Sequence, residues 1–111
     1  MGGFWQGADM PRKRRVEFPG AIFHVTVRGN GRQDIFLSNA DRERFLESLS
    51  KRVDIHAVRL YLYCLMDNHV HLVLETPRGN LSSFVGSLLT SYAVYFNKRH
   101  SRSVTFRVCP L

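Results

Sequence analysis

The stretch CLMDNHVHLVLE, residues 64–75, determines how the rest of the chain is interpreted. The dipeptide Asp67-Asn68 is a turn signal between two apolar runs, so residues 57–66 and the run that starts at His69 are predicted to form a β-hairpin. Successive side chains of a strand point to opposite faces, which places His69 and His71 side by side. Two neutral imidazoles at this spacing are able to hold one divalent cation. The alternative is that both are polar residues on a solvated face.

Two further strands and two helices are predicted around this hairpin. Residues 21–28 alternate between apolar and polar side chains after Pro19-Gly20, which predicts a first strand. Apolar residues at helical spacing predict helices over about residues 40–53 and 80–100, and residues 104–108 are expected to form a last edge strand. The order strand, helix, strand, strand, helix, strand predicts an α+β fold, a ferredoxin-like antiparallel sheet with two helices packed on one face.

The alternation along the three central strands predicts what the uncovered face of the sheet carries. If the apolar rows all meet the helices, the opposite face collects His24, Thr26, Arg28, Arg59, Tyr61, Tyr63, His69, His71 and Glu75. A cation held by His69 and His71 needs a third ligand besides water and a phosphate oxygen, and Glu75, Asp67 and His24 are the local candidates.

Composition favours a polyanionic partner. Sixteen Lys and Arg against nine Asp and Glu give a formal charge of +7 in a chain of 111 residues, long enough for one small domain. Nucleic acid is the favoured partner, and an acidic membrane surface is the alternative. No apolar run reaches the roughly 20 residues that span a bilayer, and two cysteines are too few for a disulfide framework, so a cytoplasmic protein that does not enter a membrane is expected.

Several side chains are candidates for contact with nucleic acid. The phosphate candidates are Arg28, Arg32 and Arg59, together with the run Arg12, Lys13, Arg14 and Arg15 in a basic N-terminal arm that covers residues 1–15. Tyr61 and Tyr63 are candidates for stacking on unpaired bases. The alternative for each Lys or Arg is that its side chain is simply solvated. The alternative for each tyrosine is that it fills a half-buried face of the sheet. Tyr92 and Tyr95 lie on the apolar stripe of the second helix, so core packing is expected for them.

Three blocks of sequence resemble a known family. They are PGAIFHVTVRGN (residues 19–30) with the IFL and Asp41 that follow it, YCLMDNHVHL (residues 63–72), and residues 80–100. In this order, and over about residues 11–102, they are similar to the bacterial HUH single-tyrosine transposases. The similarity is greatest to the IS200-like branch associated with repetitive extragenic palindromes.

The resemblance implies an enzyme of DNA transposition and recombination that acts on single-stranded DNA folded into hairpins. In this family the histidine pair binds Mg²⁺ or Mn²⁺, the cation polarises the scissile phosphate, and a tyrosine hydroxyl attacks to leave a 5′-phosphotyrosine bond. By position, His69 and His71 would be the metal ligands of this chain. Asn68 fills the motif position before them and is assigned no chemistry.

The chain departs from the family pattern after Arg102. Members usually continue with a Gly-x-Leu-Phe-Gln-Gly-Arg-like segment and a helix that carries the nucleophilic tyrosine, whereas this chain reads SVTFRVCPL over residues 103–111. No tyrosine is therefore assigned as nucleophile by position. We expect residues 16–111 to form a transposase-like domain without its tyrosine helix, inactive in cleavage, with weak metal and DNA binding and a tendency to form a homodimer. The alternatives are a non-catalytic module that binds single-stranded nucleic acid, or a structural remnant.

Overall fold

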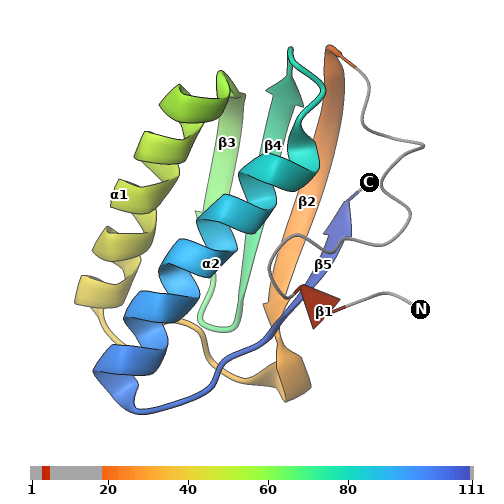
Figure 1. Cartoon of the computed structure of the whole chain (residues 1–111). Coiled ribbons are helices and arrows are strands. Elements are labelled where there is room, and N and C mark those ends of the chain that lie inside the picture. Colours follow the sequence, from red (N-terminus) through yellow and green to blue (C-terminus); the bar gives the residue numbers. More distant parts are fainter. Residues whose placement is uncertain (1–3, 6–18, 111) are drawn as a thin grey trace.

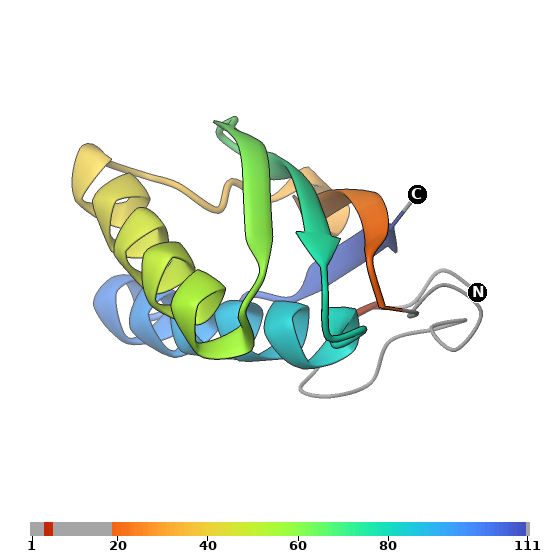
Figure 2. The same cartoon turned by 90° about the horizontal axis from the view of Figure 1, so that it is seen from above.

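The structure is a computed structural model that describes residues 4–5 and 19–110. One sheet with the strand order β1-β5-β2-β4-β3 is paired antiparallel throughout. Both helices cover one of its faces and leave the other open, as Figures 1 and 2 show. The elements are β1 (Phe4–Trp5), β2 (Ala21–Gly29), a 3-10 turn (Asn30–Arg32), α1 (Asn39–His56), β3 (Arg59–Leu65), β4 (His69–Thr76), α2 (Leu81–His100) and β5 (Phe106–Pro110).

The arrangement confirms the predicted ferredoxin-like α+β fold, because β2, α1, β3, β4, α2 and β5 follow one another in the expected order. Several boundaries differ from the prediction: β3 covers Arg59–Leu65 where residues 57–66 were expected, and β5 covers Phe106–Pro110 where residues 104–108 were expected. Helix α1 runs three residues further, to His56, where Ala57 takes a left-handed conformation and the Asn80 side-chain amide donates to the His56 carbonyl. The two residues of β1 pair with β5, in a segment where no strand was predicted.

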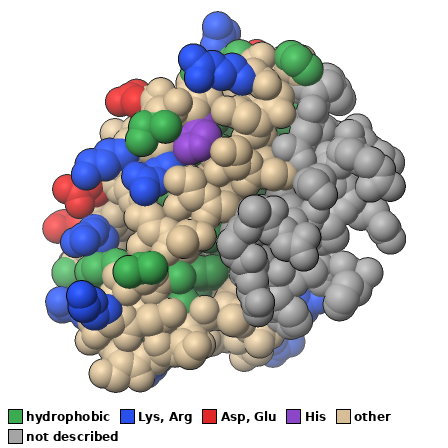
Figure 3. Space-filling view, viewed as in Figure 1, with side chains coloured by type: hydrophobic (Ala, Val, Ile, Leu, Met, Phe, Trp, Pro, Cys, Tyr) green, Lys and Arg blue, Asp and Glu red, His purple; other side chains and the backbone are tan. Residues whose placement is uncertain are grey.

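The core lies between the sheet and the helices. Alternate residues of β2 and β4 are buried against the apolar stripes of α1 and α2, and the predicted apolar rows of these two strands are confirmed. The outward sides of the helices carry Lys and Arg side chains (Figure 3). No helix in the described part of the chain is long and apolar enough to cross a membrane.

A β-bulge in β3 corrects the predicted face of four residues. Leu60 lies opposite Leu74, but the register shifts at Tyr61, so that Leu62 lies opposite Val73 and Tyr63 opposite Leu72. Paired residues of antiparallel strands share a face, so Leu62 and Cys64 join the open face, whereas Tyr63 and Leu65 turn to the helix side. The prediction that Tyr63 lies on the open face is therefore wrong, since an extra residue in one strand reverses the alternation beyond it.

A close approach of backbone constrains Gly29, the last residue of β2. A Cβ atom at this position would lie 2.2 Å from the Gln33 carbonyl oxygen and 2.9 Å from the Ile35 Cγ2 atom. We expect Gly29→Ala to lower the free energy of unfolding by about 2–3 kcal/mol, because the contact with backbone cannot relax without moving the turn. Urea denaturation checks this, with the exposed neighbour variant Asn30→Ala as control. Equal stability of the two variants would contradict the steric argument.

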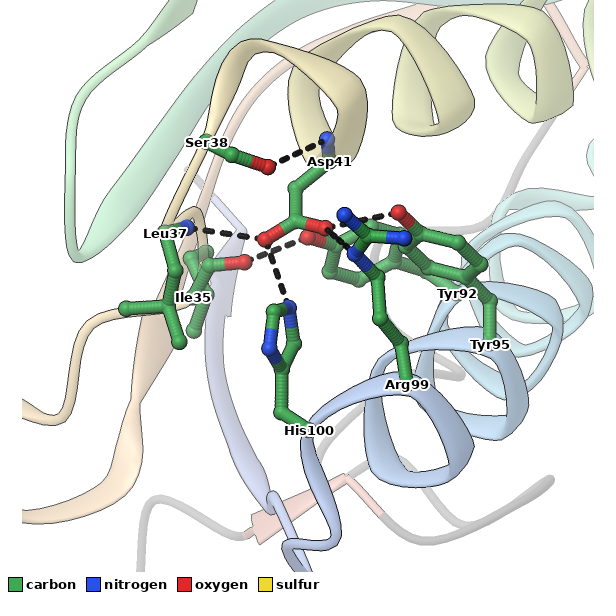
Figure 4. A network of polar contacts seen from close by, with 8 residues as sticks. All are labelled: Ile35, Leu37, Ser38, Asp41, Tyr92, Tyr95, Arg99 and His100. Atoms are coloured by element: carbon green, nitrogen blue, oxygen red, sulfur yellow. Dashed lines mark hydrogen bonds and ion pairs between the residues drawn. The ribbon is translucent and has the colours of Figure 1, made fainter.

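A buried polar network ties the ends of the two helices together (Figure 4). The Asp41 carboxylate is fully buried and accepts hydrogen bonds from the Leu37 amide at 2.9 Å, the Tyr95 hydroxyl at 2.7 Å and His100 Nε2 at 2.9 Å. Arg99 Nε lies 3.6 Å from the same group. This network joins the start of α1 to the last turns of α2 and to the segment before α1.

Candidate nucleic-acid interface

The two histidines of β4 lie side by side on the open face, as predicted. The ring centroids of His69 and His71 are 4.9 Å apart, with the planes at 85°. In the neighbouring strand β2, Arg28 lies opposite His69 and Thr26 lies opposite His71. The histidine pair therefore sits in the middle of the sheet, where strands on either side limit its movement.

Each histidine of the pair has its Nδ1 atom occupied by a neighbour. His69 Nδ1 lies 2.7 Å from Asn68 Oδ1, and His71 Nδ1 lies 3.0 Å from His24 Nε2. Because an amide oxygen only accepts, the first contact places the proton of His69 on Nδ1 and leaves a lone pair on Nε2. When His71 Nδ1 donates to His24, its Nε2 is likewise open to a cation. Orientation of this kind is typical of metal-binding histidines.

The charge state of His69 suits a metal ligand. Burial, then the positive charge of Arg28 and a smaller electrostatic contribution from the neighbouring His71, lower the pKa of His69 below its usual value. A neutral imidazole is the form that binds cations. With Nδ1 of each ring in contact with a neighbour, the Nε2 atoms of His69 and His71 are the ones that would hold a divalent cation.

The expected third ligand is not assembled. Among the described residues, no three His, Cys, Asp or Glu side chains are arranged to hold a metal ion. Of the three candidates, Glu75 accepts a hydrogen bond from the Tyr61 hydroxyl at 2.6 Å and Asp67 forms an ion pair with Arg42 at 2.5 Å. His24 contacts His71 itself. The remaining positions around a cation would fall to water and to oxygens of a bound phosphate.

The turn that leads into β4 is held firmly by its surroundings. The Asp67 carbonyl accepts from the Ile35 and Phe36 amides at 2.8 and 3.1 Å, and the Asn68 carbonyl accepts from the Gly29 amide at 3.0 Å. These bonds place the side chain of Asn68 against His69. No chemistry was expected of Asn68, and the one sequence signal for its contact with His69 is that an amide acceptor stands directly before the first histidine.

A cleft with three arginines lies next to His69. Its volume is about 310 Å³, and it is lined by Arg28, Gly29, Gly31, Arg32, Asn68 and Arg107. Arg107 of β5 lies opposite Arg28, which lies opposite His69, so the three residues form one row across the sheet. Two phosphate candidates, Arg28 and Arg32, are thus brought together. Arg107 was missed because the register of β5 is not visible in the sequence.

The other candidates lie apart from this cleft. Arg59 and Tyr61 are exposed at the far end of the edge strand β3, and Arg59 lies opposite Glu75. The hydrogen bond to Glu75 raises the pKa of Tyr61 above its usual value, so this hydroxyl stays protonated. Tyr63 lies on the helix side of the edge strand. The candidates Arg12, Lys13, Arg14 and Arg15 lie outside the described residues.

Comparison with known proteins identifies the family. The family model described as "Transposase IS200 like" matches residues 18–107. The chain belongs to the IS200-like transposase family. No protein of curated function matches it significantly.

Solved structures have the same fold as this IS200-like chain. A "putative transposase" from Deinococcus radiodurans R1 matches with a TM-score of 0.67 and 16% identity, over 85% of this chain and 79% of that protein. A REP-associated tyrosine transposase bound to a REP hairpin matches with a TM-score of 0.69 and 15% identity, over 92% of this chain. The IS200-like chain spans only 62% of the length of that second protein.

Proposed function

We propose that this IS200-like chain binds single-stranded DNA across the open face of its sheet, with a backbone phosphate in the arginine cleft beside His69. The observation that carries the proposal is the row Arg107, Arg28, His69, which places cationic side chains next to an imidazole pair whose Nε2 atoms are free to bind a cation. Phosphate contacts of this kind supply most of the affinity of proteins for DNA. The hairpin-bound neighbour supports DNA as the partner.

His69 and His71 would hold Mg²⁺ or Mn²⁺ at this face. Such a cation polarises a phosphate oxygen and stabilises charge during attack at phosphorus. Other residues of this chain would support that cation and the phosphate. Asn68 and His24 orient the two imidazoles, and the arginines of the cleft neutralise the phosphate. Tyr61, exposed on the same face, offers a ring for an unpaired base.

We propose further that these residues form the binding and metal half of a strand-transfer site and that the chain does not cleave DNA unaided. Tyr92 is buried on the helix side, donates to the Ile35 carbonyl, and burial raises its pKa far above the usual value. Tyr95 donates to Asp41 in the buried network. Tyr63 lies on the helix side of the sheet, and Tyr61 donates to Glu75.

The second candidate function is a non-catalytic module that binds single-stranded nucleic acid on the same face. The absence of a three-residue metal group from the described part of the chain favours this candidate. The two candidates share the arginine cleft and differ in whether a cation takes part.

The cleft is tested by neutralising Arg28 and Arg107 together. We expect Arg28→Gln/Arg107→Gln to weaken binding of a single-stranded oligonucleotide about tenfold in fluorescence anisotropy, and to reduce the slope of log K against log salt by about 1.4, because two phosphate contacts are lost. The matched control is Arg78→Gln/Arg102→Gln, which removes the same charge from two exposed arginines elsewhere. Equal losses in the two variants would show that binding is charge-driven background without a site.

A further inference from the structure

Two sulfur atoms lie together at the turn end of the β3–β4 hairpin. The Sγ atom of Cys64 is 3.7 Å from the Sδ atom of Met66, and both side chains are exposed. The hairpin forms one edge of the sheet (Figure 1), so solvent reaches this pair of sulfurs directly. Neither sulfur has a part in the binding of DNA or Mn²⁺ proposed above.

Strand register places the two sulfurs on the open face, next to the imidazoles. Cys64 lies opposite His71 in the antiparallel ladder. The Met66 amide donates to the His69 carbonyl at 2.8 Å, so these two residues lie opposite each other as well. Residues paired across antiparallel strands have Cβ atoms about 4.5–5.5 Å apart. The four side chains therefore form a two-by-two block, with the sulfurs on one strand and the imidazoles on the other.

The separation of the two sulfurs suits a shared cation. Metal–sulfur bonds in tetrahedral sites are about 2.3 Å long, which puts two sulfurs at neighbouring corners about 3.8 Å apart. The sulfurs of Cys64 and Met66, at 3.7 Å, already lie close to this separation. The alternative is a weak S–H···S hydrogen bond between two exposed side chains, which would give the same distance without any ligand.

His71 is placed to supply a third ligand. Its Nδ1 atom contacts His24 Nε2 at 3.0 Å, so Nε2 is the atom that would meet a cation held by the opposite cysteine. Cys64 and His71 are only two His or Cys side chains. The set therefore agrees with the finding that the described residues hold no metal-binding group of three His, Cys, Asp or Glu. The thioether of Met66 is the remaining ligand.

The types of ligand select the cation. Thiolate and thioether sulfurs are soft ligands that favour Cu⁺, whereas Mg²⁺ and Mn²⁺ favour oxygen ligands. Zn²⁺ takes Cys, His and carboxylate ligands, and this set offers only two of that kind. One thiolate, one thioether and one imidazole therefore favour Cu⁺.

We propose that Cys64, Met66 and His71 form a binding site for Cu⁺. Binding breaks the S–H bond of Cys64, releases its proton to water and forms a bond between sulfur and the cation, with no change of oxidation state. The site goes beyond the proposed function, because its two sulfurs take no part there. It shares His71 Nε2 with the proposed Mn²⁺ site, so the two cations exclude each other.

The site is tested by competition for Cu⁺ against the chromophoric chelator bicinchoninate, under anaerobic reducing conditions. We expect Cys64→Ser/Met66→Leu to weaken the affinity for Cu⁺ by more than about 100-fold and Met66→Leu alone by about tenfold, because soft ligands are lost. Both replaced side chains are exposed, so the thermal melting temperature should not change. The matched control is Cys109→Ser, which removes an exposed thiol from β5, opposite Thr26.

Two results would overturn the Cu⁺ site. One is a loss in Cys64→Ser/Met66→Leu no larger than that in Cys109→Ser. The other is an unchanged affinity in Met66→Leu, because the cysteine would then bind Cu⁺ without the thioether.

Titration with Mn²⁺ separates this proposal from the proposed function. Cys64→Ser/Met66→Leu should bind Mn²⁺ as tightly as the unmodified chain, and Cu⁺ should displace Mn²⁺ from the unmodified chain alone. Retention of Mn²⁺ by the Cu⁺-loaded chain would overturn the assignment of His71 as a Cu⁺ ligand. If the unmodified chain binds Cu⁺ as expected and no Mn²⁺, the proposed Mn²⁺ site fails and the Cu⁺ site stands.

Discussion

Replacing Asp41 by alanine is expected to lower the free energy of unfolding by about 3–5 kcal/mol. The carboxylate is fully buried, and its removal leaves the Leu37 amide, the Tyr95 hydroxyl and His100 without their acceptor. Removing one partner of a buried charged network costs this much because the other groups stay desolvated. Urea denaturation monitored by circular dichroism measures the loss. Asp54→Ala, at an exposed site in the same helix, is the control, and a loss no larger than that of the control would contradict the assigned role.

The same network makes stability depend on pH. Burial raises the pKa of Asp41, but the hydrogen bonds from Tyr95, Leu37 and His100 outweigh it, and the folded-state pKa lies below the ordinary value of 3.8. A depressed pKa means that the ionised carboxylate stabilises the fold above about pH 4 and that this contribution is lost as the pH falls through the folded value. Asp41→Asn should therefore show a shallower loss of stability below pH 4 than the unmodified chain in the same urea experiment.

Removal of both histidines of the pair is expected to abolish specific Mn²⁺ binding. His69→Ala/His71→Ala should weaken the affinity for Mn²⁺ by more than about 100-fold in isothermal titration calorimetry, because no described neighbour supplies a replacement set of ligands. Asn68→Ala keeps both imidazoles but frees His69 Nδ1, and we expect a loss of 10- to 100-fold. His56→Gln removes an imidazole from the helix side and serves as the control.

The same variants decide between the two candidate functions. If Mn²⁺ strengthens binding of single-stranded DNA by the unmodified chain and not by His69→Ala/His71→Ala, the cation bridges protein and phosphate as proposed. If the double variant binds Mn²⁺ as tightly as the unmodified chain, the histidine pair is not the metal site. If DNA affinity is the same with and without Mn²⁺ in both proteins, the non-catalytic module is the correct reading.

The periodicity of apolar residues along the sequence was enough to predict that two helices pack on one face of a sheet. Alternation over residues 21–28 and helical spacing in the two apolar stripes predicted which faces are buried, because burial of a strand or helix face repeats with the period of the element itself. The pair His69 and His71 was found in the same way, since two residues apart on one strand always share a face.

Contacts between distant segments could not be predicted from the periodicity of single strands and helices. The bulge at Tyr61 reverses the alternation within β3 and moves Tyr63 to the helix side. The partners of Asp41 come from residues 54 and 59 positions away. Arg107 reaches the arginine cleft only because β5 pairs with β2 in one particular register.

The residues of this chain specify strands, helices and the histidine pair through interactions that are complete within a few positions. Only the tertiary structure shows the contacts between distant segments: the partners of each imidazole and the arginines that lie in one row with His69. These depend on strand register and helix packing, which are set by the combined burial of residues far apart in the chain.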